Sequence, residues 1–240
     1  MTDLFTARNL CKRFGGVHAL RNVDVMQRSG ETLGMIGPNG SGKTSFVNAV
    51  TGELALDSGK VDFAGSDITG MRPHKVADAG LARTFQAVRL FAKLSVRDNL
   101  QTAMLVLEDP AHTLEATERV DLLQWLKLDN RLDAVAGSLT LFEQRRLELA
   151  MRLMMRPRLI MLDEPVGGLA PVEIRAMMQI LQELKARCSI FVIEHTMRVI
   201  RELADRVVVL ITGEKIADGP PVEILKDRRV VEQYLGTAHA

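Results

Sequence analysis

The sequence has few residues of the kinds that define several protein classes. Only two of its 240 residues are cysteines, Cys11 and Cys188, and their separation matches no metal-binding spacing. We therefore expect free thiols in a reducing compartment. Basic residues number 31 and acidic residues 30, so the net charge of +1 gives no reason to expect a nucleic-acid partner.

Long apolar segments are also missing. Every apolar run is far shorter than the roughly 18–20 residues that a membrane-spanning helix needs. Residues 1–6 lack the basic start and apolar stretch of a secretory signal peptide. We therefore expect a chain that is soluble by itself, and its length is sufficient for one large domain with a well-buried core.

What the chain does contain is one complete phosphate-binding motif. Residues 37–44 match G-x-x-x-x-G-K-[ST] at every fixed position, after an apolar strand candidate at 31–36 and before a helix candidate at 45–50. Backbone N–H groups in such a loop, at the positive end of a helix dipole, form a site for nucleotide phosphates. The predicted nucleotide contacts are Gly37, Pro38, Asn39, Gly40, Ser41, Gly42, Lys43, Thr44 and Ser45.

Hydrophobic periodicity divides the rest of the chain into an α/β part and a helical part. Alternation predicts an antiparallel pair of strands over 4–10 and 17–25. Apolar runs without alternation predict a largely parallel, buried sheet. Further strands are expected at 61–63, 81–85, 159–162, 190–193 and 207–211, an edge hairpin at 213–218, and helices at 73–79 and 171–187.

From about residue 87 to 157 the period becomes helical. Ser95 and Asp98 have the spacing of a capping box, which predicts the start of the first helix of this segment. An all-helical stretch between alternating β and α segments suggests a lobe rather than a separate domain. The expected helices run from Ser95 to about Glu108, from Thr113 past Leu126, and from Phe142 to Met155.

Two side chains of the phosphate loop and two acids after a later strand predict phosphate chemistry. Lys43 can reach the β- and γ-phosphates, and the Thr44 hydroxyl can ligate Mg²⁺. Asp163 directly follows the apolar strand at 159–162 and can hold the same ion. Glu164 would then face the γ-phosphate, where a carboxylate can orient and polarise the attacking water.

Three more residues stand where a nucleotide site needs polar or aromatic side chains. His195 follows the strand at 190–193, and ligands bind outside the carboxyl ends of parallel strands. Gln86 ends the strand expected over 81–85, and its amide can sense Mg²⁺ or water. Phe14 lies in a glycine-bearing turn, where it either stacks on a nucleotide base or covers a sheet edge; its spacing alone favours neither.

Together these motifs resemble those of the ATP-binding cassette (ABC) ATPases, and the resemblance covers nearly the whole chain. It implies that residues 37–44 are the Walker A loop and 159–164 the Walker B strand, with Glu164 as a catalytic residue. It makes His195 the second catalytic residue, the switch histidine, and Phe14 the base-stacking aromatic. It further implies ATP and Mg²⁺ as cofactors, with the metal held by Thr44, the Q-loop residue Gln86, and Asp163.

The resemblance implies a fold of the α/β class. We expect one domain, 1–240, with a P-loop NTPase core over about 1–86 and 158–240. This core should have a mixed, largely parallel sheet and an antiparallel β subdomain. The inserted helical lobe, about 87–157, should carry the segment that contacts the nucleotide of a second subunit.

Three longer segments, 83–91, 193–197 and 231–236, look like one branch of the family. They are similar to importer ATPases for branched-chain and other hydrophobic amino acids, whose relatives carry urea and amides. This implies a peripheral subunit at the cytoplasmic face of the inner or plasma membrane. Its partners would be transmembrane permease subunits, a second ABC ATPase subunit and, indirectly, a solute-binding protein, with no nucleic acid.

One motif departs from the family. The signature, usually Leu-Ser-Gly-Gly-Gln, aligns with Leu139, Thr140, Leu141, Phe142 and Glu143. Phe142 replaces the glycine that lets a helix N-terminus approach the γ-phosphate of the opposite subunit. Either its ring keeps the backbone away from that phosphate, which favours a heterodimer with an intact partner, or it packs into the lobe, which leaves a homodimer open.

Other functions are alternatives. A soluble ABC-type ATPase acting on DNA, the ribosome or cluster assembly is one, but the chain between Lys43 and Leu139 is too short for long coiled-coil arms. An ABC subunit that exports a lipid-like substrate is another. A small P-loop kinase would have no need of the signature-like segment or of His195.

Overall fold

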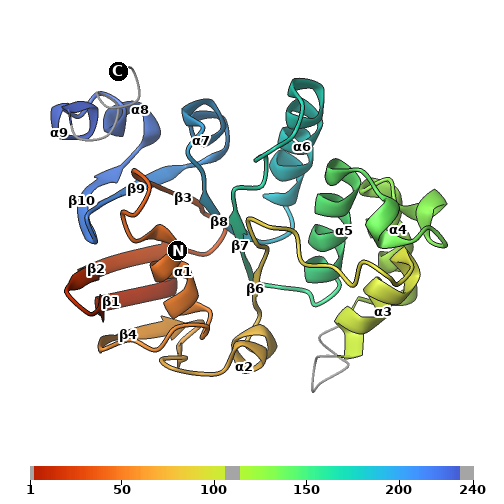
Figure 1. Ribbon diagram of the computed structural model, residues 1–240, viewed down its shortest axis with the longest axis horizontal. Helices are drawn as coiled ribbons and strands as arrows, with labels where there is room; N and C mark the ends of the chain where they lie inside the picture. Colours follow the sequence, from red (N-terminus) through yellow and green to blue (C-terminus); the bar gives the residue numbers. More distant parts are fainter. Residues whose placement is uncertain (1–2, 106–113, 233–240) are drawn as a thin grey trace.

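The computed structural model describes residues 3–105 and 114–232, which form two sheets and a group of helices (Figure 1). The first sheet is antiparallel, with strand order β2-β1-β4-β5. Its long pair, β1 and β2, confirms the pairing expected from the alternation near the start of the chain. The strands are β1 Asp3–Phe14, β2 Val17–Arg28, β4 Ser58–Phe63 and β5 Ser66–Asp67.

The second sheet has six strands in the order β10-β9-β3-β8-β7-β6, and all its pairs are parallel except β9 with β10. This confirms the mixed, largely parallel sheet with a hairpin at its edge. The strand before the phosphate loop, β3, lies in the middle, between β8 and β9. The strands are β3 Thr32–Ile36, β6 Leu81–Arg83, β7 Leu159–Asp163, β8 Ser189–Ile193, β9 Arg206–Ile211 and β10 Glu214–Gly219.

Both faces of the six-stranded sheet are covered, which explains why its central strands are apolar at nearly every position. Leu159 and Met161 of β7 belong to the core shared with the antiparallel sheet and helix α1 (Lys43–Val50), whereas Ile160 belongs to the core on the opposite face. Phe46 of α1 stacks on Phe191 of β8, with ring centroids 5.8 Å apart. The helix that follows the phosphate loop is thus fixed against the sheet by buried aromatic rings.

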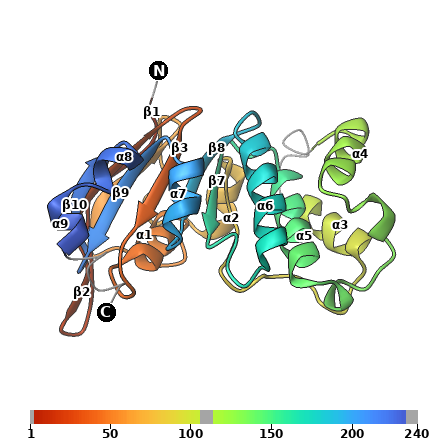
Figure 2. The ribbon, with the colours of Figure 1, turned by 90° about the horizontal axis from the view of Figure 1, so that it is seen from above.

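The helical region lies at the opposite end of the molecule from the antiparallel sheet (Figures 1 and 2). Its main helices are α3 (Val96–Leu105), α4 (Ala116–Trp125) and α5 (Leu141–Leu153). Ser95 and Asp98 form the predicted capping box: the Asp98 N–H donates to Ser95 Oγ at 3.1 Å, and the Ser95 N–H donates to Asp98 Oδ2 at 3.4 Å. None of the described helices is both long and apolar enough to span a membrane.

Several predicted boundaries were wrong. The second helix of the helical region begins at Ala116 rather than at Thr113, because the Glu118 carboxylate caps it by accepting from the Glu115 N–H at 2.8 Å. Strand β6 ends at Arg83, two residues before the predicted end. Thr113 and Glu108 lie outside the described residues. The remaining helices include three short ones that the periodicity did not predict, α7 to α9; the set is α2 Pro73–Asp78, α6 Pro171–Leu184, α7 Met197–Leu203, α8 Pro221–Ile224 and α9 Arg228–Val230.

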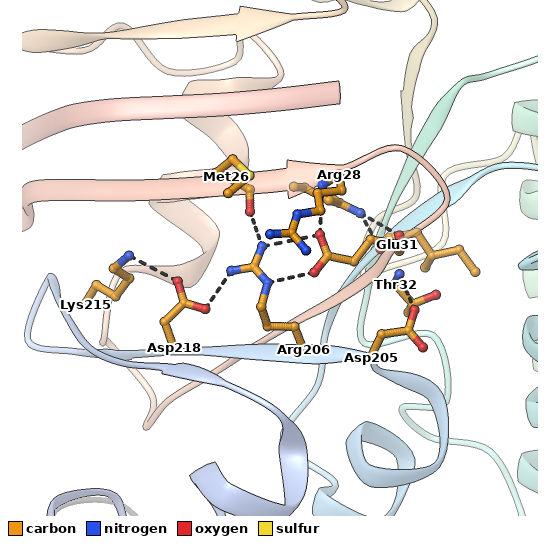
Figure 3. A network of polar contacts seen from close by, with 10 residues as sticks. Met26, Arg28, Glu31, Thr32, Asp205, Arg206, Lys215 and Asp218 are labelled. Carbon is orange, nitrogen blue, oxygen red and sulfur yellow. Dashed lines mark hydrogen bonds and ion pairs between the residues drawn. The ribbon is translucent and has the colours of Figure 1, made fainter. Parts of the chain in front are cut away.

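A network around Arg206 joins the two sheets (Figure 3). From the start of β9, its guanidinium binds Glu31 at 2.7 Å and Asp218 of β10 at 2.6 Å, and it donates to the carbonyl of Met26 in β2. Lys215 also pairs with Asp218, at 3.2 Å. The network lies at the amino end of β3 and β9, whereas the phosphate loop follows the carboxyl end of β3, so it fixes the sheets without occupying the site.

Candidate nucleotide-binding site

The phosphate loop is held by close backbone contacts at two of its glycines. A Cβ on Gly37 would lie 2.0 Å from the carbonyl oxygen of Leu210, and one on Gly42 would lie 2.3 Å from that of Ala19. Both residues have positive φ, 154° and 105°. Only glycine fits there, so the loop is clamped between β9 and β2 and keeps a concave shape.

Lys43 lies inside this loop. Its Nζ donates to the carbonyl oxygens of Gly37 and Pro38 at 2.7 and 3.0 Å. Burial lowers the pKa of Lys43, and the nearby carboxylates of Glu164 and Asp163 oppose that shift. The two acids are therefore close enough to the lysine to act on its charge, as a shared phosphate site requires.

Thr44 and Ser45 occupy the first turn of α1, directly after Lys43. The first N–H groups of a helix have no partners within the helix, and they carry its partial positive charge. No acidic side chain lies in this first turn. The residues from Gly37 to Ser45 thus lie between β3 and the first turn of α1, with helix N–H groups beside the lysine.

Asp163 is the last residue of β7, and its side chain is buried. Arg83 Nη2 donates to its Oδ2 at 3.2 Å, and its backbone N–H donates to the Thr84 hydroxyl at 3.4 Å. Burial raises the pKa of Asp163 above its ordinary value, although the Arg83 charge opposes the shift. The Asp163 carboxylate is thus held on one side by Arg83, the last residue of the neighbouring strand β6.

The side chain of Glu164 lies beside two other predicted site residues, Gln86 and His195. Gln86 Nε2 donates to its Oε2 at 2.9 Å, and His195 Nδ1 lies 3.6 Å from its Oε1. The backbone of Glu164 is left-handed, with φ 48°, and its N–H donates to the carbonyl of Ile193 at 2.9 Å. Residues from the ends of β7 and β8 and from the segment after β6 therefore meet at one edge of the sheet.

Glu194 supports this cluster, although it was not among the site residues predicted from the sequence. Its side chain is fully buried, and it accepts hydrogen bonds from the N–H groups of Val166 and Thr196 at 3.2 and 3.4 Å. Burial raises the pKa of Glu194. Its position ties the turn after Glu164 to the turn that carries His195. The only sign of Glu194 in the sequence is that an acidic residue directly follows the apolar strand at 190–193.

Phe14 ends β1 at the tip of the first hairpin and is 51% exposed. Lys12 Nζ lies 5.5 Å from its ring centroid. The same hairpin contributes Ala19, whose carbonyl contacts Gly42 of the phosphate loop. The ring thus protrudes from the element that borders the loop, with an accessible surface that stacking on a base would need.

The signature-like segment begins α5. Thr140 is its N-cap: its Oγ accepts from the Glu143 N–H at 3.3 Å, and Glu143 Oε2 accepts from the Thr140 N–H at 2.9 Å. Of the two flanking leucines, Leu139 is buried and Leu141 is exposed. The helix start is therefore closed by a reciprocal capping box made from its own side chains.

Phe142 points away from this helix end. Its ring is partly buried against the core of the helical region, and the Arg146 guanidinium lies 4.6 Å from the ring centroid. Arg146 in turn donates to the carbonyl of Leu126 at 2.9 Å. Of the two orientations considered for Phe142, the side chain has the one that packs into the helical region.

One face of α5 carries buried charges that contact the Gln86 segment. Arg145 donates to the carbonyls of Gly167 at 2.6 Å and Gln86 at 3.5 Å. Glu148, 1% exposed, accepts from the Arg89 N–H at 3.2 Å. Burial raises the pKa of Glu148 to about 7. The helix that starts with the signature thus also holds the segment around Gln86.

Glu148→Gln is expected to change how stability depends on pH. Because the folded-state pKa of about 7 exceeds the ordinary 4.5, folding retains a proton between these values. The stabilising contribution of the carboxyl is complete below about pH 4.5 and is lost as the pH rises through 7. Glutamine does not titrate, so the variant should gain stability relative to wild type over this range, by up to about 3 kcal/mol.

Urea unfolding of both proteins across about pH 5 to 8 measures the effect. Glu202→Gln, which removes an exposed carboxyl on α7, is the matched control. A constant difference between wild type and Glu148→Gln at every pH would contradict the expectation.

A magnesium ion fits this donor set. Within residues 3–105 and 114–232, no group of three or more His, Cys, Asp or Glu side chains is placed to hold a metal by itself. Nucleotide-bound Mg²⁺ needs only one or two carboxylates, because phosphate oxygens and waters supply the rest of its shell. The Asp163 carboxylate, the Thr44 hydroxyl and the Gln86 amide oxygen offer hard oxygen ligands beside the phosphate loop.

Comparison with known families and relatives agrees with these features. The family described as ABC transporter matches residues 20–167, and the family described as branched-chain amino acid ATP-binding cassette transporter matches residues 214–240. A probable branched-chain amino acid transport ATP-binding protein, LivG, from Archaeoglobus fulgidus is 35% identical over 97% of this chain and 95% of its own length. The BraF protein from Pseudomonas aeruginosa, described as a high-affinity branched-chain amino acid transport ATP-binding protein, is also 35% identical, over 95% and 96% of the two chains.

A solved structure has the same fold. The crystal structure of the ADP conformation of an ATP-binding cassette of an ABC transporter superposes with a TM-score of 0.85 at 30% identity, covering 98% of this chain and 100% of that one. The fold of this chain is thus that of an ATP-binding cassette of closely similar length.

Proposed function

Because this chain belongs to the ABC transporter family of ATP-binding cassettes, we propose that it binds and hydrolyses ATP to drive a membrane importer. The solute is proposed to be a branched-chain or other hydrophobic amino acid or a related amide, since relatives at 35% identity are described as branched-chain amino acid transport proteins. The chain would act peripherally, at the cytoplasmic face of the membrane, on separate permease subunits.

The observation that carries the ATPase proposal is the convergence of polar groups beside the phosphate loop. Glu164 contacts Gln86 and approaches His195, while Asp163 and Glu164 both act on the charge of Lys43. Phosphoryl transfer to water requires positioning and charge stabilisation more than covalent chemistry. A loop for the phosphates, an acid for the metal and an acid for the water supply those functions.

Each residue has a distinct proposed role. Lys43 and the N–H groups of the loop bind the β- and γ-phosphates, and Phe14 stacks on the base. Asp163 holds the metal together with Thr44 and Gln86, and Mg²⁺, when bound, neutralises charge on the phosphates. Glu164 orients the attacking water and accepts its proton. His195 contacts the γ-phosphate from the end of β8.

Coupling to transport is proposed to pass through the Gln86 segment and the helical region. Phe91 and Leu94 follow Gln86 and are exposed, 54% and 38% respectively. Their apolar surface lies next to a segment that Arg145 and Glu148 of α5 already hold. A permease that pushes on this surface would move Gln86 relative to Glu164.

The experiment is co-expression with candidate permease subunits, followed by purification and uptake of radiolabelled leucine into vesicles. We expect the permease to co-purify and uptake to require internal ATP. ATP hydrolysis without any associated permease would contradict the transport proposal while leaving the ATPase proposal intact.

We further propose that the chain pairs with a different ABC ATPase, in which its own signature segment serves a weakened site. The ring of Phe142 packs into the helical region, but the residue still has a Cβ where the usual motif has glycine, and the capping box of Thr140 and Glu143 satisfies donors that a phosphate would otherwise use. Lost charge-assisted hydrogen bonds are each worth about 1.5–3 kcal/mol. One good site, built on this chain's Walker A loop and the partner's signature, would then sustain turnover.

Phe142→Gly is expected to increase ATP-dependent self-association of the purified chain. Because the wild-type signature is proposed to hold a phosphate poorly, wild type should stay largely monomeric with ATP, whereas the variant should dimerise and hydrolyse ATP faster. Sedimentation velocity and steady-state ATPase assays measure both, and Leu141→Gly is the control for added flexibility at the same helix end. A wild-type homodimer in which two nucleotides turn over at equal rates would defeat the proposal.

A further inference from the structure

Arg83 is a buried arginine outside the motifs that define the site. It is the last residue of β6, and its side chain is 8% exposed. Burial of a guanidinium costs free energy unless its charge and its donors are matched. Its partners therefore indicate what holds it there. Besides the Glu53 carboxylate, 3.6 Å from Nη1, they come from three different parts of the nucleotide site.

The first partner is Asp163, which accepts from Arg83 Nη2 at 3.2 Å. The second is α1, the helix of the phosphate loop: Nη1 donates to Asn48 Oδ1 at 2.5 Å and lies 3.4 Å from the hydroxyl of Thr51 at the helix end. The third is the Gln86 segment, where the guanidinium lies 4.6 Å from the ring centroid of Phe85. The Arg83 guanidinium thus links the proposed metal ligand Asp163, the phosphate-loop helix α1 and the segment that carries Gln86.

Stability alone does not explain this arrangement. A buried ion pair is often no more stabilising than apolar residues of similar volume. Arg83 Nε is also buried without a hydrogen-bond partner among the described residues, which adds a cost. The geometry also has a consequence for the metal site. A guanidinium that binds one carboxylate oxygen holds that oxygen in place and leaves the other oxygen available.

We infer that Arg83 is a positioning residue for the magnesium–nucleotide complex, which fixes the Asp163 carboxylate relative to α1 and to the Gln86 segment. The inference rests on the proposed ATPase function, because that function assigns Mg²⁺ to Asp163. Partners that orient a metal ligand commonly change metal affinity or activity by about 10–100-fold when they are removed. Arg83 itself does not touch the nucleotide or the metal in this assignment.

Arg89 provides a matched control. Its guanidinium also stacks on Phe85, 3.6 Å from the ring centroid, and it also pairs with Glu53, at 3.8 Å compared with 3.6 Å for Arg83. It is 61% exposed, however, and no contact joins its side chain to Asp163 within the described residues. Substitution of Arg89 therefore removes contacts with Phe85 and Glu53 like those of Arg83, and it leaves the contact between Arg83 and Asp163 in place.

The test is binding of the non-hydrolysable analogue AMP-PNP to the purified full chain, measured by calorimetry with excess Mg²⁺ and again with EDTA. For Arg83→Met we expect the gain in affinity due to Mg²⁺ to fall about 10–100-fold, with affinity in EDTA unchanged. Arg89→Met should keep the wild-type gain. Arg83→Lys, which retains the charge but not the two-pronged donor, should recover part of it.

Two results would overturn the inference: a wild-type Mg²⁺ gain in Arg83→Met, or equal losses of affinity in both buffers, as a general structural role would give. If Arg83→Met does not fold, Arg83→Lys is compared in the wild-type and Asp163→Asn backgrounds. The substitution should reduce the Mg²⁺ gain only where Asp163 is present; equal reductions in both would also refute the inference. If wild type binds AMP-PNP in neither buffer, the ATPase proposal itself fails. That result differs from any loss that is confined to the Arg83 variants.

Discussion

Glu164→Gln is expected to slow ATP hydrolysis about 10²–10⁴-fold while ATP binding is retained. Glu164 is placed for this role by its backbone, whose left-handed φ of 48° is unusual for a residue with a side chain. Its carboxylate lies between the Gln86 amide and His195. Glutamine keeps the size and the polar contacts, but it cannot accept a proton from the attacking water.

Steady-state hydrolysis by the purified transporter complex, combined with ATP binding to the isolated chain, separates the two effects. Glu202→Gln on α7 is the control, because it removes an exposed carboxylate whose partner is Arg198. Hydrolysis near the wild-type rate in Glu164→Gln would remove Glu164 from the catalytic role. A parallel loss of ATP binding would instead assign it to nucleotide binding.

Lys43→Ala is expected to abolish nucleotide binding without unfolding the protein. Hydrogen bonds to charged groups are worth about 1.5–3 kcal/mol each, so loss of contacts to two phosphates lowers the affinity by roughly two to four orders of magnitude. In the protein alone, the ammonium bonds mainly with loop carbonyls, those of Gly37 and Pro38. The hydrophobic cores on either side of the sheet do not depend on it.

The measurement is the rise in melting temperature when ATP is added, since a ligand of the native state stabilises it by mass action. Lys60→Ala is the matched control, because Lys60 is a half-exposed lysine of β4 that pairs with Asp62. An ATP-induced rise in Lys43→Ala as large as in wild type would show that the loop is not the binding site.

The sequence was most informative where local pattern and chemistry coincide. The phosphate loop is specified by consecutive residues, and its glycines are required by backbone contacts as close as that between Gly37 and Leu210. Parallel buried strands were predictable because both of their faces lie in apolar cores. Asp163, Glu164 and His195 could be proposed as site residues because each lies at or just after the carboxyl end of such a strand.

Residues that act only through tertiary contacts could not be predicted in this way. Arg83, Glu148 and Glu194 look like ordinary charged residues until the fold buries them against α1, the Gln86 segment and the turn after Glu164. The orientation of Phe142 depends on Arg146 one turn later and on the core of the helical region. Spacing along the chain specifies neither burial nor rotamer.

The central position of β3 has a consequence for synthesis of the chain on the ribosome. Its neighbours, β8 and β9, are encoded near the other end: the Thr32 N–H bonds to Asp205 across 173 residues. At roughly 5–20 residues per second, the 173 residues between Thr32 and Asp205 take about 9–35 s to synthesise, and β3 has no β9 to pair with during that time. Contacts between α3 and α5 span a much shorter stretch of chain, which closes at lower entropic cost. A nascent chain whose β9 has not yet emerged therefore carries the phosphate-binding sequence but lacks the Leu210 carbonyl against which Gly37 packs.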